Sequence, residues 1–251
     1  MKINGGYMRA STFTDQNKRK SNQDNKLIIP KIIHGNKTIF ALVADGMGGT
    51  EHGEIASQIA KEEMEAWYAE NIEHVIAKPE KIKESLLNVI QEINQKVIYY
   101  GMEHRVSLGT TMTMLLIYKK NFYVANIGDS RVYQLGKTPQ QITQDHTAAQ
   151  QEVNMGRMTE EEAKTSTLSH KLTRCIGMEE FVNPDFFYGK TKKGDYFLLC
   201  SDGMYNRVDL EEINKIAKST VLSTKEKLTE LTILSKSKDE KDNITGIFIE
   251  V

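Results

Sequence analysis

The chain has 251 residues, of which 39% are hydrophobic and 27% are charged, and its formal net charge is -1. This composition is typical of a globular protein with a large core, and the near-neutral charge argues against non-specific binding to nucleic acid or anionic membranes. No apolar run approaches the ~18 residues that span a bilayer or resembles a signal peptide. Two cysteines, Cys175 and Cys200, suit a reducing compartment. We expect a cytoplasmic monomer with no nucleic-acid or membrane partner.

Three strands are predicted before residue 50, at residues 7–14, at 27–33 and in the apolar run that ends at Asp45. The polar turn between the first two carries Lys18, Arg19 and Lys20, which form either a solvated surface or a site for an anion. Glycines follow Asp45 and permit a tight, accessible turn that carries its carboxylate out of the core. The other interpretation is an ordinary strand-to-helix turn with a capping aspartate.

The remaining chain alternates between helical and strand periodicity. Helices are predicted from residue 52 to about 68, and at 80–104, 209–218 and 224–235; strands are predicted at 110–118, 122–127, 131–135, 182–188, 195–200 and 244–251. Short turns between successive strands predict antiparallel neighbours. Residues 147–170 are polar, with two short helices around 148–155 and 159–164, and predict a surface segment. We expect a single domain over residues 1–251.

Four aspartates lie where an apolar strand ends or begins: Asp45, Asp129, Asp202 and Asp242. Antiparallel neighbours can bring strand ends together, and gathered carboxylates repel one another unless a cation neutralises them. Ligands that are all oxygen select hard ions such as Mg²⁺ or Mn²⁺, whereas zinc prefers histidine and cysteine. Two such ions sharing a carboxylate can activate a bridging water for attack on phosphorus. Alternatively, each aspartate caps its own turn.

A cysteine-dependent phosphatase is a rival chemistry. It needs five residues between the thiolate and an arginine, whereas six residues separate Cys200 from Arg207. The neighbouring Asp202 would also raise the pKa of the thiol, so Cys200 is predicted to be a core residue. Two Gly-Lys-Thr triplets, at residues 136–138 and 189–191, lack the first glycine of a nucleotide-binding P-loop and are interpreted as turns.

Eight motifs, taken together and in this order, resemble bacterial members of the metal-dependent protein phosphatase 2C family. They are TDQNKRKSNQD (14–24), DGMGG (45–49), GTT (109–111), NIGDSRVY (126–133), ITQDHT (142–147), LTRCIG (172–177), CSDGM (200–204) and DNIT (242–245). The resemblance covers essentially the whole chain. It implies an α+β fold, a four-layer α-β-β-α sandwich of two antiparallel sheets flanked by helices, with a mobile flap at residues 147–170.

The resemblance also implies the activity and its partners. The expected reaction is hydrolysis of phosphoserine and phosphothreonine in phosphorylated proteins by attack of a metal-bridging water, opposing a bacterial Ser/Thr kinase of the same pathway. The implied cofactors are two Mn²⁺ or Mg²⁺ ions in the core site, with a third, weaker ion beside them. A catalytically silent relative that binds phosphoproteins is the alternative, and the presence of all four aspartates favours the enzyme.

Roles transfer by motif. Asp45 is expected to bridge two metals, and the carbonyl of Gly46 to bind the second. Asp202 and Asp242 are expected to complete the first metal site, so these three aspartates are the implied catalytic residues. Asp129, with Asp202, resembles the ligands of the third metal.

Other positions match the family less closely. Arg19 looks like the arginine that grips the substrate phosphate, a role that suits its planar fork. Gln23 stands where many relatives have a glutamate, which leaves Asp24 as the expected holder of metal-bound water. Met47 stands where eukaryotic relatives have a histidine proposed as general acid, and metal-bound water is the expected substitute. His52 is interpreted as a solvent-facing residue at a helix start.

Overall fold

The computed structural model describes residues 8–47 and 52–251. Predictions for residue 7 and for Gly48 and Gly49 of the DGMGG motif therefore lie outside the described residues. Every strand pairing is antiparallel. One sheet has the order β1 (Arg9–Asp15), β11 (Ile244–Glu250), β10 (Tyr196–Cys200), β7 (Arg131–Leu135) and β8 (Gln140–Gln141). The other has the order β2 (Asp24–Ile33), β3 (Asn36–Met47), β5 (Met112–Tyr118), β6 (Asn121–Ile127) and β9 (Asp185–Lys190), with β4 (Gly109–Thr110) paired to β3.

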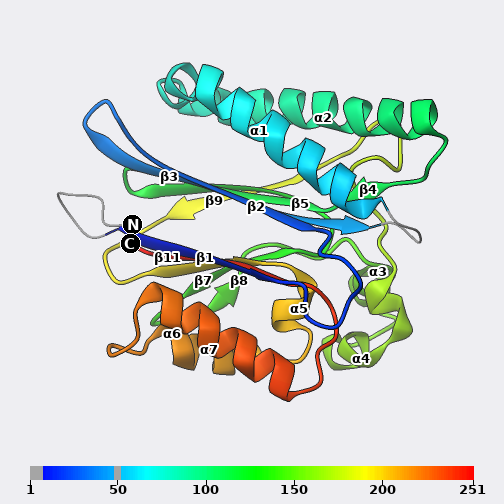
Figure 1. The fold of residues 1–251 in the computed structure, drawn as a ribbon. Helices are drawn as coiled ribbons and strands as arrows, with labels where there is room; N and C mark the ends of the chain where they lie inside the picture. Colours follow the sequence, from blue (N-terminus) through cyan, green and yellow to red (C-terminus); the bar gives the residue numbers. More distant parts are fainter. Residues whose placement is uncertain (1–7, 48–51) are drawn as a thin grey trace.

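Helices cover the outer face of each sheet (Figure 1). Long helices α1 (Gly53–Ile76) and α2 (Ile82–His104), joined by η1 (Pro79–Lys81), lie over the sheet that contains β3. The other sheet is covered by α5 (Asp202–Tyr205), α6 (Leu210–Ala217) and α7 (Thr224–Ser237). The segments α3 (Ala148–Asn154), α4 (Glu160–Thr165) and η2 (Thr167–His170) lie at one end of the sandwich. The predicted α+β fold with an α-β-β-α layering is confirmed.

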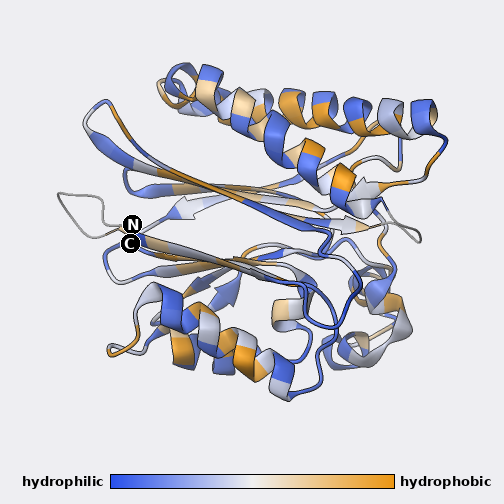
Figure 2. Cartoon of the chain, in the orientation of Figure 1, coloured by the Kyte–Doolittle hydropathy of each residue, from blue (hydrophilic) through white to orange (hydrophobic). Residues whose placement is uncertain are grey.

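The burial of strand β3 explains the continuous apolar run in its sequence. Phe40 and Leu42 pack towards α1 and α2, whereas Ile39, Ala41 and Val43 pack into the layer between the two sheets. Both faces of the strand are buried, so the usual alternation of apolar and polar residues is absent. Figure 2 shows hydrophilic and hydrophobic residues mixed along helices α1 and α7. No helix in residues 8–47 and 52–251 combines the length and apolarity needed to cross a membrane.

The predicted turn at Asp45 is wrong, because β3 continues through Met47 and pairs Gly46 and Met47 with β4. Gly46 makes this possible. A Cβ atom there would lie 2.1 Å from the carbonyl oxygen of Gly53, so only glycine lets the start of α1 approach the strand so closely. Asp45 is therefore held on a strand, half-buried, rather than on an exposed turn.

The prediction that residues 122–127 and 131–135 are antiparallel neighbours is also wrong. Strand β6 belongs to one sheet and β7 to the other, so residues 128–130 carry the chain across the sandwich. Gly128 has a φ of +100°. A Cβ at that position would lie 2.5 Å from the Thr111 side chain, so glycine is required for both conformation and space.

Four smaller features differ from the expectations. Strand β9 begins at Asp185 rather than at residue 182, and the triplet at 189–191 is no turn because Gly189 and Lys190 pair with β6. Gly189 is needed there because a Cβ would lie 2.6 Å from the Phe122 ring. The predicted helix from residue 52 runs much further, to Ile76, and the four-residue helix α5 has no counterpart among the predicted elements.

Candidate active site

Five aspartates form the carboxylate cluster, to which both sheets contribute: Asp24, Asp45, Asp129, Asp202 and Asp242. Asp24 and Asp45 are cross-strand partners in β2 and β3. Asp202 follows β10, and Asp242 precedes β11. Burial, and then the charges of the other four members, raise the pKa of Asp45 well above its usual range. The charges of neighbouring members of this set contribute to the raised pKa values of Asp24, Asp45, Asp129 and Asp202.

Asp24 has one of its two carboxylate oxygens held by a protein side chain. Its Oδ2 accepts a hydrogen bond from Ser201 Oγ at 2.8 Å. Its Oδ1 is buried and has no hydrogen-bond partner. Burial raises the pKa of this carboxyl to about 6, and the nearby Asp242 adds to the effect. Half of the carboxylate is therefore satisfied by the protein, while the other half is left for a donor or a cation.

Asp202 and Asp129 are similarly placed. Asp202 Oδ2 accepts from Asn206 Nδ2 at 3.1 Å, but Oδ1 is buried without a partner. Burial and then Asp129 raise the pKa of Asp202 well above its usual range. The pKa of Asp129 is raised to about 7, first by burial and then by Asp145. For both carboxyls, burial outweighs the interactions that favour the charged form.

Asp242 has the one direct cationic partner among the described members of the cluster. Arg19 Nη2 donates to Asp242 Oδ2 at 2.6 Å, and 59% of the Arg19 side chain is exposed. The backbone of the same residue is held by Glu240, whose Oε1 accepts from Asp242 N at 2.9 Å. Asn17 Nδ2 donates to the Asp242 carbonyl at 3.0 Å. The loop that carries Arg19 is thereby bound to the start of β11.

Asn243 strengthens that connection and was not singled out by the sequence. Its Nδ2 donates to the carbonyls of Gln16 and Ser21, both at 2.9 Å, and its Oδ1 accepts from Gln23 N at 2.9 Å. Membership in the DNIT motif was the available signal, but the motif does not say which backbone groups the amide meets. Ser201, in CSDGM, was missed for the same reason.

The backbone around Asp45 is also constrained. Its N–H donates to Thr111 Oγ1 at 2.9 Å, and its carbonyl accepts from Thr110 Oγ1 at 3.0 Å and from Thr111 N at 2.8 Å. Gly46 N donates to the carbonyl of Gln23 at 3.1 Å. The GTT motif therefore holds the strand segment that carries the Asp45 carboxylate.

The positions that depart from the family pattern lie at the start of α1 or near it. Gln23 Nε2 donates to Glu54 Oε2 at 3.2 Å. Met47 is half-buried at the end of β3, and His52 precedes α1 without a side-chain cap hydrogen bond. His52 is half-buried rather than fully solvent-facing.

Cys200 does not suit a nucleophile. Its side chain is fully buried in the layer between β10 and helices α5–α7, and burial raises the pKa of the thiol well above its usual range. The thiolate is therefore disfavoured, and the predicted core role is confirmed.

The donor chemistry of the carboxylate cluster fits a hard divalent cation. Its ligands are oxygen only, and the unpartnered Asp24 Oδ1 and Asp202 Oδ1 are the kind of buried acceptor that a cation satisfies. A cation would also relieve the repulsion that keeps the pKa values high. Within the described ranges, no three acidic, histidine or cysteine side chains are already arranged as a complete ligand group. The side chains therefore fit a divalent metal in their donor chemistry.

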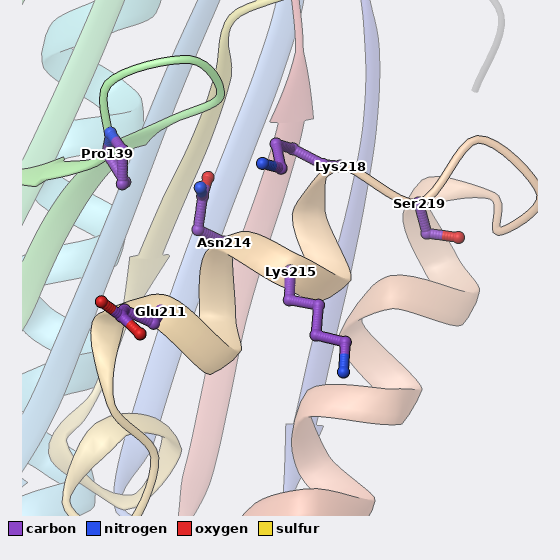
Figure 3. Close-up of a pocket in the computed structure, with 6 residues that line it drawn as sticks. All are labelled: Pro139, Glu211, Asn214, Lys215, Lys218 and Ser219. Carbon is purple, nitrogen blue, oxygen red and sulfur yellow. The ribbon is translucent and has the colours of Figure 1, made fainter.

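A surface pocket of about 420 Å³ lies away from the cluster (Figure 3). It lies between α6 and the turn that follows β7, and it is lined by Pro139, Glu211, Asn214, Lys215, Lys218 and Ser219. Asn214 already exchanges two hydrogen bonds with the backbone of Gly136. The pocket contains no member of the carboxylate cluster and is not the candidate active site.

Two face-to-face antiparallel sheets with acidic residues gathered at one end define a candidate metal-dependent hydrolase. The model of the family described as protein phosphatase 2C matches residues 15–235. The serine/threonine phosphatase Stp of Listeria welshimeri is 33% identical over 97% of this chain and 96% of its own length. Protein phosphatase PhpP of Streptococcus pneumoniae is 30% identical, with 97% and 98% coverage. The structure of serine/threonine phosphatase Stp1 from Staphylococcus aureus is 30% identical, covers 98% of this chain and 96% of its own, and has a TM-score of 0.89. The chain belongs to the protein phosphatase 2C family.

Proposed function

We propose that this protein hydrolyses phosphoserine and phosphothreonine in phosphorylated proteins, using Mn²⁺ or Mg²⁺ held by the carboxylate cluster. Family membership and the similarity to bacterial serine/threonine phosphatases support the reaction class. The observation that carries the metal requirement is the pair of buried, unpartnered oxygens, Asp24 Oδ1 and Asp202 Oδ1, inside a group of mutually repelling carboxyls.

The proposed ligands follow from the cluster. Asp45 would be shared between two ions, with the Gly46 carbonyl on the second ion and Asp202 and Asp242 on the first. Asp129 with Asp202 would hold a third, weaker ion. When bound, such ions acidify a water molecule and neutralise phosphoryl oxygens. The protein's own contribution is to hold these oxygens from two sheets and several loops at one end of the sandwich.

Arg19 is proposed to bind the substrate phosphate. Its guanidinium is exposed, and it already contacts the cluster through Asp242 Oδ2. A cation held by Asp242 would compete for that oxygen, which would leave the planar fork available for a phosphate. Asp24 is proposed to orient water, because its buried Oδ1 can accept a hydrogen bond from that water while Ser201 donates to Oδ2.

Residues 147–170 are proposed to be a substrate-recognition flap. The base of the segment is fixed by the bridge between Thr147 and Leu172, but only Ala149 and Ala163 are buried among the apolar residues of the two helices α3 and α4. Met155 is 60% exposed, and Arg157 is held by a surface ion pair with Glu152. Few buried contacts imply a small free energy for local opening.

The test uses the purified chain with p-nitrophenyl phosphate and with phosphoserine and phosphothreonine peptides. We expect hydrolysis with added Mn²⁺ or Mg²⁺ and none after exhaustive chelation. Asp202→Asn should nearly abolish turnover because it removes a charged ligand, and it should also weaken Mn²⁺ binding in calorimetry. Cys200→Ser, a change at the adjacent strand end, is the control and should retain substantial turnover. Full activity after chelation would refute metal dependence, and a folded but inactive Cys200→Ser protein would restore the cysteine mechanism.

An opposing Ser/Thr kinase in the same pathway and a monomeric state remain predictions.

A further inference from the structure

The crossing segment 128–130 is held by hydrogen bonds on both sides of Asp129. Gly128 N donates to His146 Nδ1 at 3.1 Å, and the Gly128 carbonyl accepts from His146 N at 3.0 Å. Ser130 Oγ shares a hydrogen bond with Thr111 Oγ1 at 2.8 Å, and the Ser130 carbonyl accepts from Thr113 Oγ1 at 3.0 Å. The chain on either side of Asp129 therefore has little freedom to shift.

Asp129 itself is held from the helix that carries Asp202. The Tyr205 hydroxyl donates to the Asp129 carbonyl at 2.8 Å, and the tyrosine is buried. Tyr205 is the last residue of α5, and Asp202 is the first. One short helix thus supplies one carboxylate of the cluster and the hydrogen bond that holds the backbone of another.

Arg131 fixes the ring of Tyr205. The guanidinium carbon of Arg131 lies 3.6 Å from the ring centroid of Tyr205, which is a close cation–π contact. The guanidinium is in turn held by Asp145, with Nε to Oδ1 at 2.9 Å and Nη2 to Oδ2 at 2.6 Å. This bidentate geometry fixes the plane of the guanidinium and therefore the face that it presents to Tyr205. Side-chain exposures of 24% for Arg131 and 10% for Asp145 leave the pair largely shielded from water.

We propose that Asp145, Arg131 and Tyr205 form a positioning chain that holds Asp129 beside Asp202. None of the three would touch the substrate or the reacting atoms. Asp145 orients Arg131, Arg131 stacks on Tyr205, and Tyr205 fixes the carbonyl of Asp129, so that the two carboxylates keep one relative position. This inference rests on the proposed metal-dependent function and deepens it by assigning roles to the arginine of NIGDSRVY and the aspartate of ITQDHT.

The test is Tyr205→Phe in the full chain, which removes only the hydroxyl. Tyr68→Phe is the matched control, because it also removes one hydroxyl from a buried tyrosine, but the hydroxyl of Tyr68 on α1 has no hydrogen-bond partner. Mn²⁺ binding is measured by calorimetric titration, and thermal unfolding under chelation shows that each variant is folded. Loss of one neutral hydrogen bond should weaken the lowest-affinity Mn²⁺ binding by about threefold to tenfold in Tyr205→Phe. The control should change it less than about twofold.

A double-mutant cycle separates positioning from a general loss of stability. If Tyr205 acts through Asp129, Tyr205→Phe should add no further loss of Mn²⁺ affinity in an Asp129→Asn background. Equal losses in Tyr205→Phe and Tyr68→Phe, or an additive effect in the Asp129→Asn background, would overturn the positioning chain while the unchanged protein still hydrolyses its substrates. Absence of both Mn²⁺ binding and hydrolysis in the unchanged protein would instead refute the proposed function, and this inference with it.

Discussion

Replacing Asp129 with asparagine should reduce the pH dependence of stability in the metal-free protein. The pKa of this carboxyl is raised from its usual 3.8 to about 7, mainly by burial. An acid with a higher pKa in the folded state holds its proton more tightly there, so its stabilising contribution is complete below about pH 4 and is lost as the pH rises through 7. The asparagine side chain has no such proton to lose, so the variant lacks this contribution to the pH dependence.

The magnitude follows from the two pKa values. Between them, the free energy of unfolding falls by about 1.4 kcal/mol for each pH unit. From pH 5 to pH 7, ionisation of Asp129 therefore lowers the free energy of unfolding by about 2 kcal/mol, a large share of the roughly 5–15 kcal/mol that stabilises a typical domain. The unchanged chain should lose more than this, because burial and repulsion also raise the pKa of Asp24, to about 6.

Urea unfolding under chelation at pH 5, 6 and 7 measures the effect, with the fluorescence of Trp67 as the signal, since that side chain packs against the core beneath α1. Asp195→Asn is the control, because Asp195 is buried outside the cluster and its Oδ2 accepts from Gln134 Nε2 at 2.9 Å. The free energy of unfolding of the Asp195→Asn variant should fall with rising pH as steeply as that of the unchanged chain. If the free energy of unfolding of Asp129→Asn also falls as steeply with rising pH as that of the unchanged chain, the electrostatic description of the cluster is incorrect.

Two further predictions concern the substrate. Arg19→Ala should raise the KM for a phosphopeptide by a factor that corresponds to about 1.5–3 kcal/mol, the value of a charge-assisted hydrogen bond. Lys18→Ala, which removes an exposed pair with Asp239, should leave KM nearly unchanged, and equal effects of the two variants would remove Arg19 from the phosphate site. Alanine substitutions at Met155, Arg157 and Met158 should change the ranking among phosphopeptides more than the hydrolysis rate of p-nitrophenyl phosphate. Parallel rate measurements that show the same change for both substrate types would argue against a recognition flap.

Periodicity was sufficient for most of the secondary structure. Helix α2 was predicted to within two residues of its observed bounds because an amphipathic helix leaves a repeat in the local sequence, and strand β7 because glycine-containing turns flank it on both sides. The grouping of Asp45, Asp202 and Asp242 was also predictable, since each lies at the end or beginning of an apolar strand. Cys200 was recognised as a core residue from its apolar strand and from the spacing to Arg207.

Only the tertiary structure decided how the segments at the cluster are connected. The sequence determined that residues 128–130 are a tight glycine-containing turn, but a short turn can join neighbours in one sheet or two strands in different sheets. The choice depends on which apolar faces meet, and β7 packs Val132 into the layer between the sheets while β6 pairs with β9. Likewise, the link from Asp145 through Arg131 and Tyr205 to Asp129 spans residues 129 to 205. Hydrogen bonds and ring contacts between residues so far apart leave no local periodicity in the chain, so they are decided only when the two sheets pack together.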